Sequence, residues 1–233
     1  MSLDDYLSDI KRYLKERYKD NLSAILIFGS ANTGHFVERK SDIDLIILLK
    51  NKKELNLERE KEILFKERKS LKWSIVHFDT IKEYEKHIYK KGSWSSWITV
   101  INGSKKLYRT NEFEKFRKRL ISKPISKKKL KKYIKDKDKF ELDGYFKNIK
   151  EFESLKGLFS HLRRKLQIMN YYENKTILFD YEKCLKNINL DKNKEIMLNK
   201  LYDNYVKRKT LPKKDIDDYY EISRELTKKT INY

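Results

Sequence analysis

Two aspartates, Asp42 and Asp44, stand one residue apart at the start of a strongly apolar run, residues 43–49. An apolar run of this length predicts a buried strand, and residues two apart in a strand point to the same face of the sheet. Adjacent carboxylates repel each other unless a cation lies between them. Because Mg²⁺ prefers oxygen ligands and often takes two protein carboxylates, the pair indicates a magnesium site.

A second short motif, Gly29-Ser30, follows another apolar run, residues 23–28. Glycine after such a run predicts a tight turn that leaves a buried strand. The backbone N–H groups of such a turn, together with the Ser30 hydroxyl, can bind an anion. A phosphate-binding turn beside a two-carboxylate metal site is what phosphoryl or nucleotidyl transfer requires.

Together, Phe28-Gly29-Ser30 and Ser41-Asp42-Ile43-Asp44-Leu45 resemble the signature of the DNA polymerase beta-type nucleotidyltransferase superfamily. That signature is a strand ending in Gly-Ser, a loop of about ten residues, and Asp-hydrophobic-Asp opening the next strand. The resemblance implies that Gly29, Ser30 and Ser41 hold a nucleoside triphosphate. It further implies that Asp42 and Asp44 are catalytic and bind metal, with two Mg²⁺ ions expected.

Members of this superfamily usually add a third carboxylate on a later strand, which corresponds here to residues 73–79. This strand offers Ser74 or His77 where an acid is expected, and its only acid is Asp79. His77 is a candidate base or metal ligand, or else a histidine at a polar strand edge. Asp79 is a candidate catalytic acid, or else the N-cap of a helix over residues 80–89.

The elements around these motifs predict an α+β fold. Apolar spacing predicts an amphipathic helix over residues 3–18, and strands are expected at 23–28, 43–49, 73–78 and 105–108. Further helices are expected at 58–71 and 112–120. From Pro124 onward only helical patterns follow, at 125–140, 155–172, 196–206 and after Pro212. We therefore predict a nucleotidyltransferase domain over 1–122, a small mixed sheet flanked by helices, and a helical domain over 123–233.

The chain is strongly basic, with 56 Lys and Arg against 35 Asp and Glu, a formal charge of +21. Such an excess attracts anionic partners, and RNA is a plausible one. The candidate contacts are Lys128 and Lys131 in a lysine-rich helix, and Arg163-Arg164 in a later one. Alternatively, these are solvated surface charges, and an A/T-rich genome would itself favour lysine over arginine.

Other features exclude several classes of protein. A single cysteine, Cys184, rules out an internal disulfide and fits a reducing cytoplasm. No apolar run is long enough to span a membrane, so we expect no membrane partner. The sequence does not predict the oligomeric state.

The expected function is metal-dependent transfer of a nucleoside monophosphate, most often AMP from ATP, to RNA such as tRNA or to a partner protein, releasing pyrophosphate. A cationic small molecule fits such a basic chain poorly as acceptor. The alternative is a non-catalytic protein of the same fold that binds nucleic acid or a partner. The absent third carboxylate favours this alternative, whereas the intact Gly-Ser and Asp-Ile-Asp motifs favour the enzyme.

Overall fold

The computed structural model describes residues 3–33, 36, 43–51, 56, 59–60, 62, 74–101, 103–142 and 152–232. The chain divides into two compact units. The first comprises residues 1–90 and 96–124, and the second comprises residues 91–95 and 125–233.

A four-stranded mixed sheet forms the centre of the first unit. Its strands are β1 (Leu22–Phe28), β2 (Ile43–Leu49), β3 (Ser74–Thr80) and β4 (Lys105–Arg109), in the order β3-β2-β1-β4. β2 and β3 run parallel, while β1 is antiparallel to both of its neighbours. β1 and β2 are almost wholly buried because both occupy the middle of the sheet.

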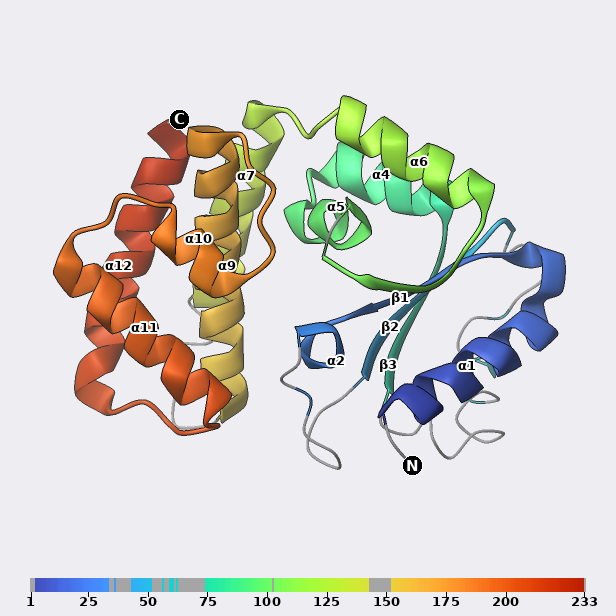
Figure 1. Ribbon diagram of the computed structural model, residues 1–233. Coiled ribbons are helices and arrows are strands. Elements are labelled where there is room, and N and C mark those ends of the chain that lie inside the picture. The colour runs from blue at the N-terminus through green and yellow to red at the C-terminus, as the bar shows by residue number, and fades with distance from the viewer. Residues whose placement is uncertain are drawn as a thin grey trace. The chain divides into compact units, whose positions relative to one another are not determined.

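Helices cover both faces of this sheet (Figure 1). On one face lies α1 (Leu3–Tyr18), whose Leu7, Ile10 and Leu14 pack against alternate residues of β1 and β2. On the other lie α4 (Ile81–Lys91) and α6 (Asn111–Ser122). Further helical elements are η1 (Lys19–Asn21), α2 (Ser30–Thr33) and α5 (Trp94–Ile101).

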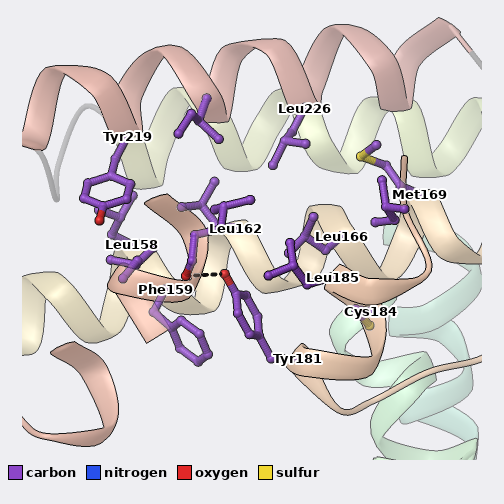
Figure 2. Packing of buried hydrophobic residues seen from close by; sticks show 14 of the residues in the cluster. Leu158, Phe159, Leu162, Leu166, Met169, Tyr181, Cys184, Leu185, Tyr219 and Leu226 are labelled. Atoms are coloured by element: carbon purple, nitrogen blue, oxygen red, sulfur yellow. Dashed lines mark hydrogen bonds between the residues drawn. The ribbon is translucent and has the colours of Figure 1, made fainter. Parts of the chain in front are cut away.

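Among the described residues of the second unit, helices are the only regular secondary structure. It contains α7 (Lys127–Lys137), a π-helix η3 (Asp138–Leu142), α9 (Phe152–Asn174), α10 (Tyr181–Lys186), α11 (Lys192–Val206) and α12 (Lys213–Asn232). In Figure 2 the apolar residues of α9, among them Leu158, Leu162 and Leu166, lie together with Tyr219 and Leu226 of α12. This single core accounts for the periodic apolar spacing of the helices.

The sheet, its flanking helices and the helical region after it confirm the predicted α+β architecture. The helices α2, α5 and α10 and the short 3₁₀-helix η1 were not predicted. The helix expected at 58–71 lies largely outside the described residues. Within the part of the chain that the structure describes, no helix is both long and apolar enough to cross a membrane.

Candidate active site

The candidate active site begins at the contact between Gly29 and Asp44. Gly29 follows β1 with a φ of +68°, the left-handed region that favours glycine. Phe28 and Asp44 are paired across β1 and β2, so the Asp44 side chain lies beside the turn. A Cβ built on Gly29 would overlap Asp44 Oδ2 and lie 3.1 Å from its Cγ. Only glycine therefore allows the carboxylate to take this position.

The carboxylate oxygens at this contact are the kind of ligand that a divalent cation such as Mg²⁺ prefers. Asp44 is half-buried and presents carboxylate oxygens over a residue without a side chain, in a space that any Cβ would fill. Asp42 and Ser41, the other predicted residues of this motif, lie outside the described residues. Among the residues that are described, no group of three or more His, Cys, Asp or Glu side chains forms a metal cluster.

Ser30 begins α2 directly after the Gly29 turn, and Asn32 fixes this segment. The Asn32 backbone N–H donates to the Gly29 carbonyl at 3.2 Å. Its side-chain Nδ2 donates to the Gly103 carbonyl at 3.0 Å, in the connection between α5 and β4. The turn that carries Gly29 and Ser30 is therefore attached to a second segment of the same unit. Sequence reasoning missed Asn32, because nothing in the pattern indicated its distant partner.

His77 lies on the same face of the sheet as Asp44. It is paired with Ile46 on β2, two residues beyond Asp44, and residues two apart share a face. The His77 side chain is exposed, and its ring lies 6.2 Å from the ring of Phe28 at a tilt of 34°. The structure therefore places Phe28 and Asp44 in one row at the Gly29 end of this face, and His77 in the adjoining row at the middle of β3.

Asp79 lies at the opposite end of β3. The β3 residue paired with Asp44 is Ile75, and Asp79 is paired with Leu48 instead. Four residues of strand separate these positions by about 13 Å. The prediction that Asp79 caps the next helix is wrong by one residue, because α4 begins at Ile81. Thr80 accepts from the Glu83 N–H at 3.2 Å, while Asp79 accepts from the Thr80 N–H at 2.9 Å.

The predicted nucleic-acid contacts fall in the second unit, in different surroundings. On α7, Lys128 is exposed and Lys131 is half-buried. On α9, the Arg163 guanidinium lies 5.8 Å from the Phe159 ring centre and 5.3 Å from that of Phe179, a cation–π geometry. Arg163 is thus packed on aromatic rings rather than extended into solvent.

Arg164 takes part in an ionic network at the end of α7, where its guanidinium pairs with Glu141. His161, only 2% exposed, lies between two carboxylates, with Nδ1 3.0 Å from Glu141 Oε2 and Nε2 2.8 Å from Asp138 Oδ1. Lys165 adds a contact of 2.7 Å to Asp138. Burial raises the pKa of Glu141, but hydrogen bonding from His161 and the charge of Arg164 lower it to about 2. This network joins α7, η3 and α9.

The sheet, the Gly29 turn and the carboxylate beside it define a class of protein. Residues 7–97, which contain β1, β2 and β3, match a family model described as a nucleotidyltransferase domain. The chain is also 32% identical over 101 residues to a Methanocaldococcus jannaschii protein whose name marks it as a candidate protein adenylyltransferase. That alignment covers 43% of this chain and 93% of the relative. The chain therefore belongs to the nucleotidyltransferase domain family.

A solved structure shares the fold over nearly the whole length. It is the spectinomycin adenyltransferase AAD(9) from Enterococcus faecialis, solved with ATP and spectinomycin. The TM-score is 0.58 at 12% identity, and the match covers 97% of this chain and 98% of the other. At this identity the likeness establishes the fold, including the helical region that follows the sheet.

Proposed function

We propose that this protein is a metal-dependent adenylyltransferase, which transfers AMP from ATP to a hydroxyl group of a protein and releases pyrophosphate. The contact between Gly29 and Asp44 carries the proposal. It supports a carboxylate site directly beside a phosphate-binding turn, within the segment that matches the family model. The names of the two similar proteins support adenylyl rather than another nucleotidyl group.

In this proposal Asp42 and Asp44 hold Mg²⁺, and Gly29, Ser30 and Ser41 bind phosphate oxygens. The metal, when bound, neutralises the phosphate charge and stabilises the pyrophosphate leaving group. The acceptor oxygen forms a bond to the α-phosphorus while the bond from that phosphorus to the bridging oxygen breaks. The bonding electron pair leaves with pyrophosphate. The protein must therefore bind the nucleotide, align the acceptor hydroxyl with the α-phosphorus and accept the proton of that hydroxyl.

His77 is the candidate that receives the acceptor proton. It is exposed, shares a face with Asp44, and lies one row of side chains away from it. An imidazole can act as a general base near neutral pH. Asp79 is not given this role, because about 13 Å of strand separates it from the position paired with Asp44.

A protein is the favoured acceptor because the relative from Methanocaldococcus jannaschii bears a name of that kind. The formal charge of +21 would attract an acidic protein surface. RNA is the other acceptor to be tested, in which case Lys128, Lys131, Arg163 and Arg164 are the proposed contacts. Both acceptors carry hydroxyl groups, so the chemistry at the α-phosphorus is the same.

The test is to incubate the purified protein with Mg²⁺ and each α-³²P-labelled nucleoside triphosphate, adding either total tRNA or cytosolic protein. Products are separated on a denaturing gel and treated with nuclease or protease. We expect ATP to give a protease-sensitive labelled band. A nuclease-sensitive band would reassign the acceptor to RNA, whereas label from another nucleotide alone would contradict the adenylyl assignment.

One observation favours a second candidate, a non-catalytic member that binds a partner. The β3 residue paired with Asp44 is Ile75, so the described residues provide no third carboxylate at that position. Such a protein would transfer no label from any nucleotide. Its binding to RNA would weaken steeply as salt is raised.

A further inference from the structure

A lysine outside the segment that matches the family model lies on the same face of the sheet as Asp44. Lys106 of β4 is paired with Leu26, and Leu26 is paired with Ile46, which in turn is paired with His77. Directly paired residues share a face, so one row of side chains crosses all four strands. Phe28 and Asp44 form the next row, toward the Gly29 turn.

The Lys106 amine points to the Gly29 end of the sheet. Its Nζ donates to the Ser104 carbonyl at 3.2 Å, and Ser104 immediately precedes β4. β4 is antiparallel to β1, and Lys105 is paired with Ile27. Ser104 therefore lies level with the last residue of β1, just before Gly29.

The same short connection also anchors the Gly29 turn. Asn32 of α2 donates to the carbonyl of Gly103, the neighbour of Ser104. The connection is itself fixed to α5, since Ser104 Oγ donates to the Thr99 carbonyl at 2.6 Å and the Gly103 N–H donates to the Ile98 carbonyl at 2.7 Å. The Lys106 amine and the Gly29 turn are thus hydrogen-bonded to the adjacent residues Ser104 and Gly103. Figure 1 shows α2 at the end of β1.

The surroundings of Lys106 are positively charged and short of counterions. Among the described residues, no carboxylate oxygen lies within 4 Å of its amine. Glu114 is the acid whose charge acts on it, yet Glu114 pairs with both Arg109 and Arg117 at 3.2 Å. Burial lowers the pKa of Lys106, and the charge of Arg117 lowers it further. Among the described residues here, the three cations Lys106, Arg109 and Arg117 share the one carboxylate of Glu114, which favours an anionic ligand.

We propose that the Lys106 amine binds the outer phosphates of the nucleoside triphosphate, completing from β4 the site that Gly29, Ser30 and Asp44 begin. This inference rests on the proposed function, since it names a further binding residue of that site. A lysine amine is a point charge that suits phosphate oxygens. Because only the outer phosphates are contacted, Lys106 should distinguish ATP from adenosine.

The test compares Lys106→Met with Lys105→Met. Lys105 is the adjacent residue, is exposed, faces the opposite side of β4 and pairs with Asp4 at 3.3 Å, so it is a matched control. The Kd values of Mg-ATP and adenosine are measured by calorimetry. We expect Lys106→Met to weaken ATP binding by about 10- to 100-fold, with adenosine unchanged. Lys105→Met should leave both unchanged, and Lys106→Arg should retain most of the ATP affinity.

A second measurement uses the unaltered chain, in case the methionine variant does not fold. Acetylation of Lys106 and Lys105 is followed by peptide mass spectrometry, with and without Mg-ATP. Protection of Lys106 alone supports the inference, whereas equal acetylation with and without ATP overturns it.

The failures of the two proposals are distinguishable. Unchanged ATP affinity in folded Lys106→Met, with label transfer intact, overturns the role of Lys106 and leaves the proposed function standing. Equal weakening of ATP and adenosine assigns Lys106 a structural role and also overturns it. If the unaltered chain binds and transfers no nucleotide, the proposed function itself fails and this inference falls with it.

Discussion

The Asp44 carboxylate lies directly over the Cα of Gly29, across the neighbouring strands β1 and β2. The two residues belong to different motifs and are separated by fourteen residues of chain, and the pairing of Phe28 with Asp44 brings them together. Gly29 is required there twice over, since its φ is +68° and a Cβ would overlap Oδ2 of Asp44. The geometry of the candidate site therefore depends on the absence of a Cβ atom at position 29.

Replacing Gly29 by alanine should remove nucleotide binding and also lower stability. A non-glycine residue at this φ costs about 1–3 kcal/mol, and the added methyl group displaces the Asp44 carboxylate. Gly92→Ala is the control, because Gly92 has a φ of +65° and its Cβ would lie 2.9 Å from the Lys129 carbonyl oxygen, within the second unit. Thermal unfolding and ATP titration should show both variants destabilised and only Gly29→Ala unable to bind. ATP binding by Gly29→Ala at the unaltered affinity would contradict this account.

His77→Ala should slow transfer strongly while leaving the affinity for ATP close to unchanged. General bases typically contribute about 10²- to 10⁴-fold to a rate, and His77 is placed to act on the acceptor rather than on the nucleotide. Asp79→Asn is the comparison and should retain transfer. The measurements are single-turnover rates and their pH profiles. Loss of activity in Asp79→Asn with full activity in His77→Ala would reverse the assignment.

The Glu141 network should make the stability of the second unit pH-dependent. The pKa of Glu141 is lowered in the folded state from its ordinary value of 4.5 to about 2. The carboxylate therefore stabilises the fold fully above pH 4.5, and this contribution is lost as the pH falls toward 2. Urea unfolding at pH 7 and pH 3 measures the loss.

Glu141→Gln is the informative variant for this network. Removing the Glu141 charge leaves Arg164 without the carboxylate that it pairs with, so we expect a loss of about 3 kcal/mol at pH 7 and a weaker dependence on pH. An identical pH dependence in the variant and the unaltered chain would show that Glu141 does not carry this effect.

We also propose that the second unit is a folding domain, as the predicted boundary between residues 122 and 123 implies. Its core is formed entirely by residues between Leu155 and Leu226. A fragment of residues 125–233 should therefore show helical circular dichroism and cooperative unfolding. Leu162→Asp in the same fragment is the control and should abolish cooperativity. A fragment that lacks helix from the outset would contradict the proposal.

Within the full chain, Trp94 should contribute to the stability of the second unit through its contacts with α9. It is 1% exposed, donates from Nε1 to Gln167 Oε1 at 3.3 Å, and its ring lies 5.4 Å from that of Tyr171. Trp94→Ala should cost about 3–5 kcal/mol in urea unfolding, the usual penalty for removing a buried aromatic side chain. An unchanged unfolding free energy would contradict this placement.

The sequence predicted the strands and long helices well because their apolar patterns are local. The predicted strand 43–49 and helix 3–18 coincide with β2 and α1. The helix α5 was missed because Ile98, Thr99 and Val100 are β-branched and therefore favour a strand. Packing against other elements overrides the preference of these residues for a strand. One such contact is the hydrogen bond from Trp97 Nε1 to the Leu120 carbonyl at 3.2 Å.

The candidate site was predictable in part for the same reason. Gly29, Ser30 and Asp44 form short motifs, and their spacing in the chain is visible in the sequence. Asn32 donates to the carbonyl of Gly103, and Lys106 donates to the carbonyl of Ser104. Gly103 and Ser104 lie some seventy residues beyond the turn, so the placement of both donors depends on the pairing of β1 with β4. Register between distant strands follows from packing, which no local pattern shows.

The most direct test of the central claim is label transfer from ATP by the unaltered chain and by Asp44→Asn. ATP labelled at the α- or the γ-phosphate is incubated with Mg²⁺ and acceptor, and products are resolved on a denaturing gel. We predict that α-label enters the acceptor, that γ-label is released as pyrophosphate, and that Asp44→Asn transfers none while melting at nearly the same temperature. Equal transfer by Asp44→Asn, or no transfer of α-label by the unaltered chain, would contradict the account.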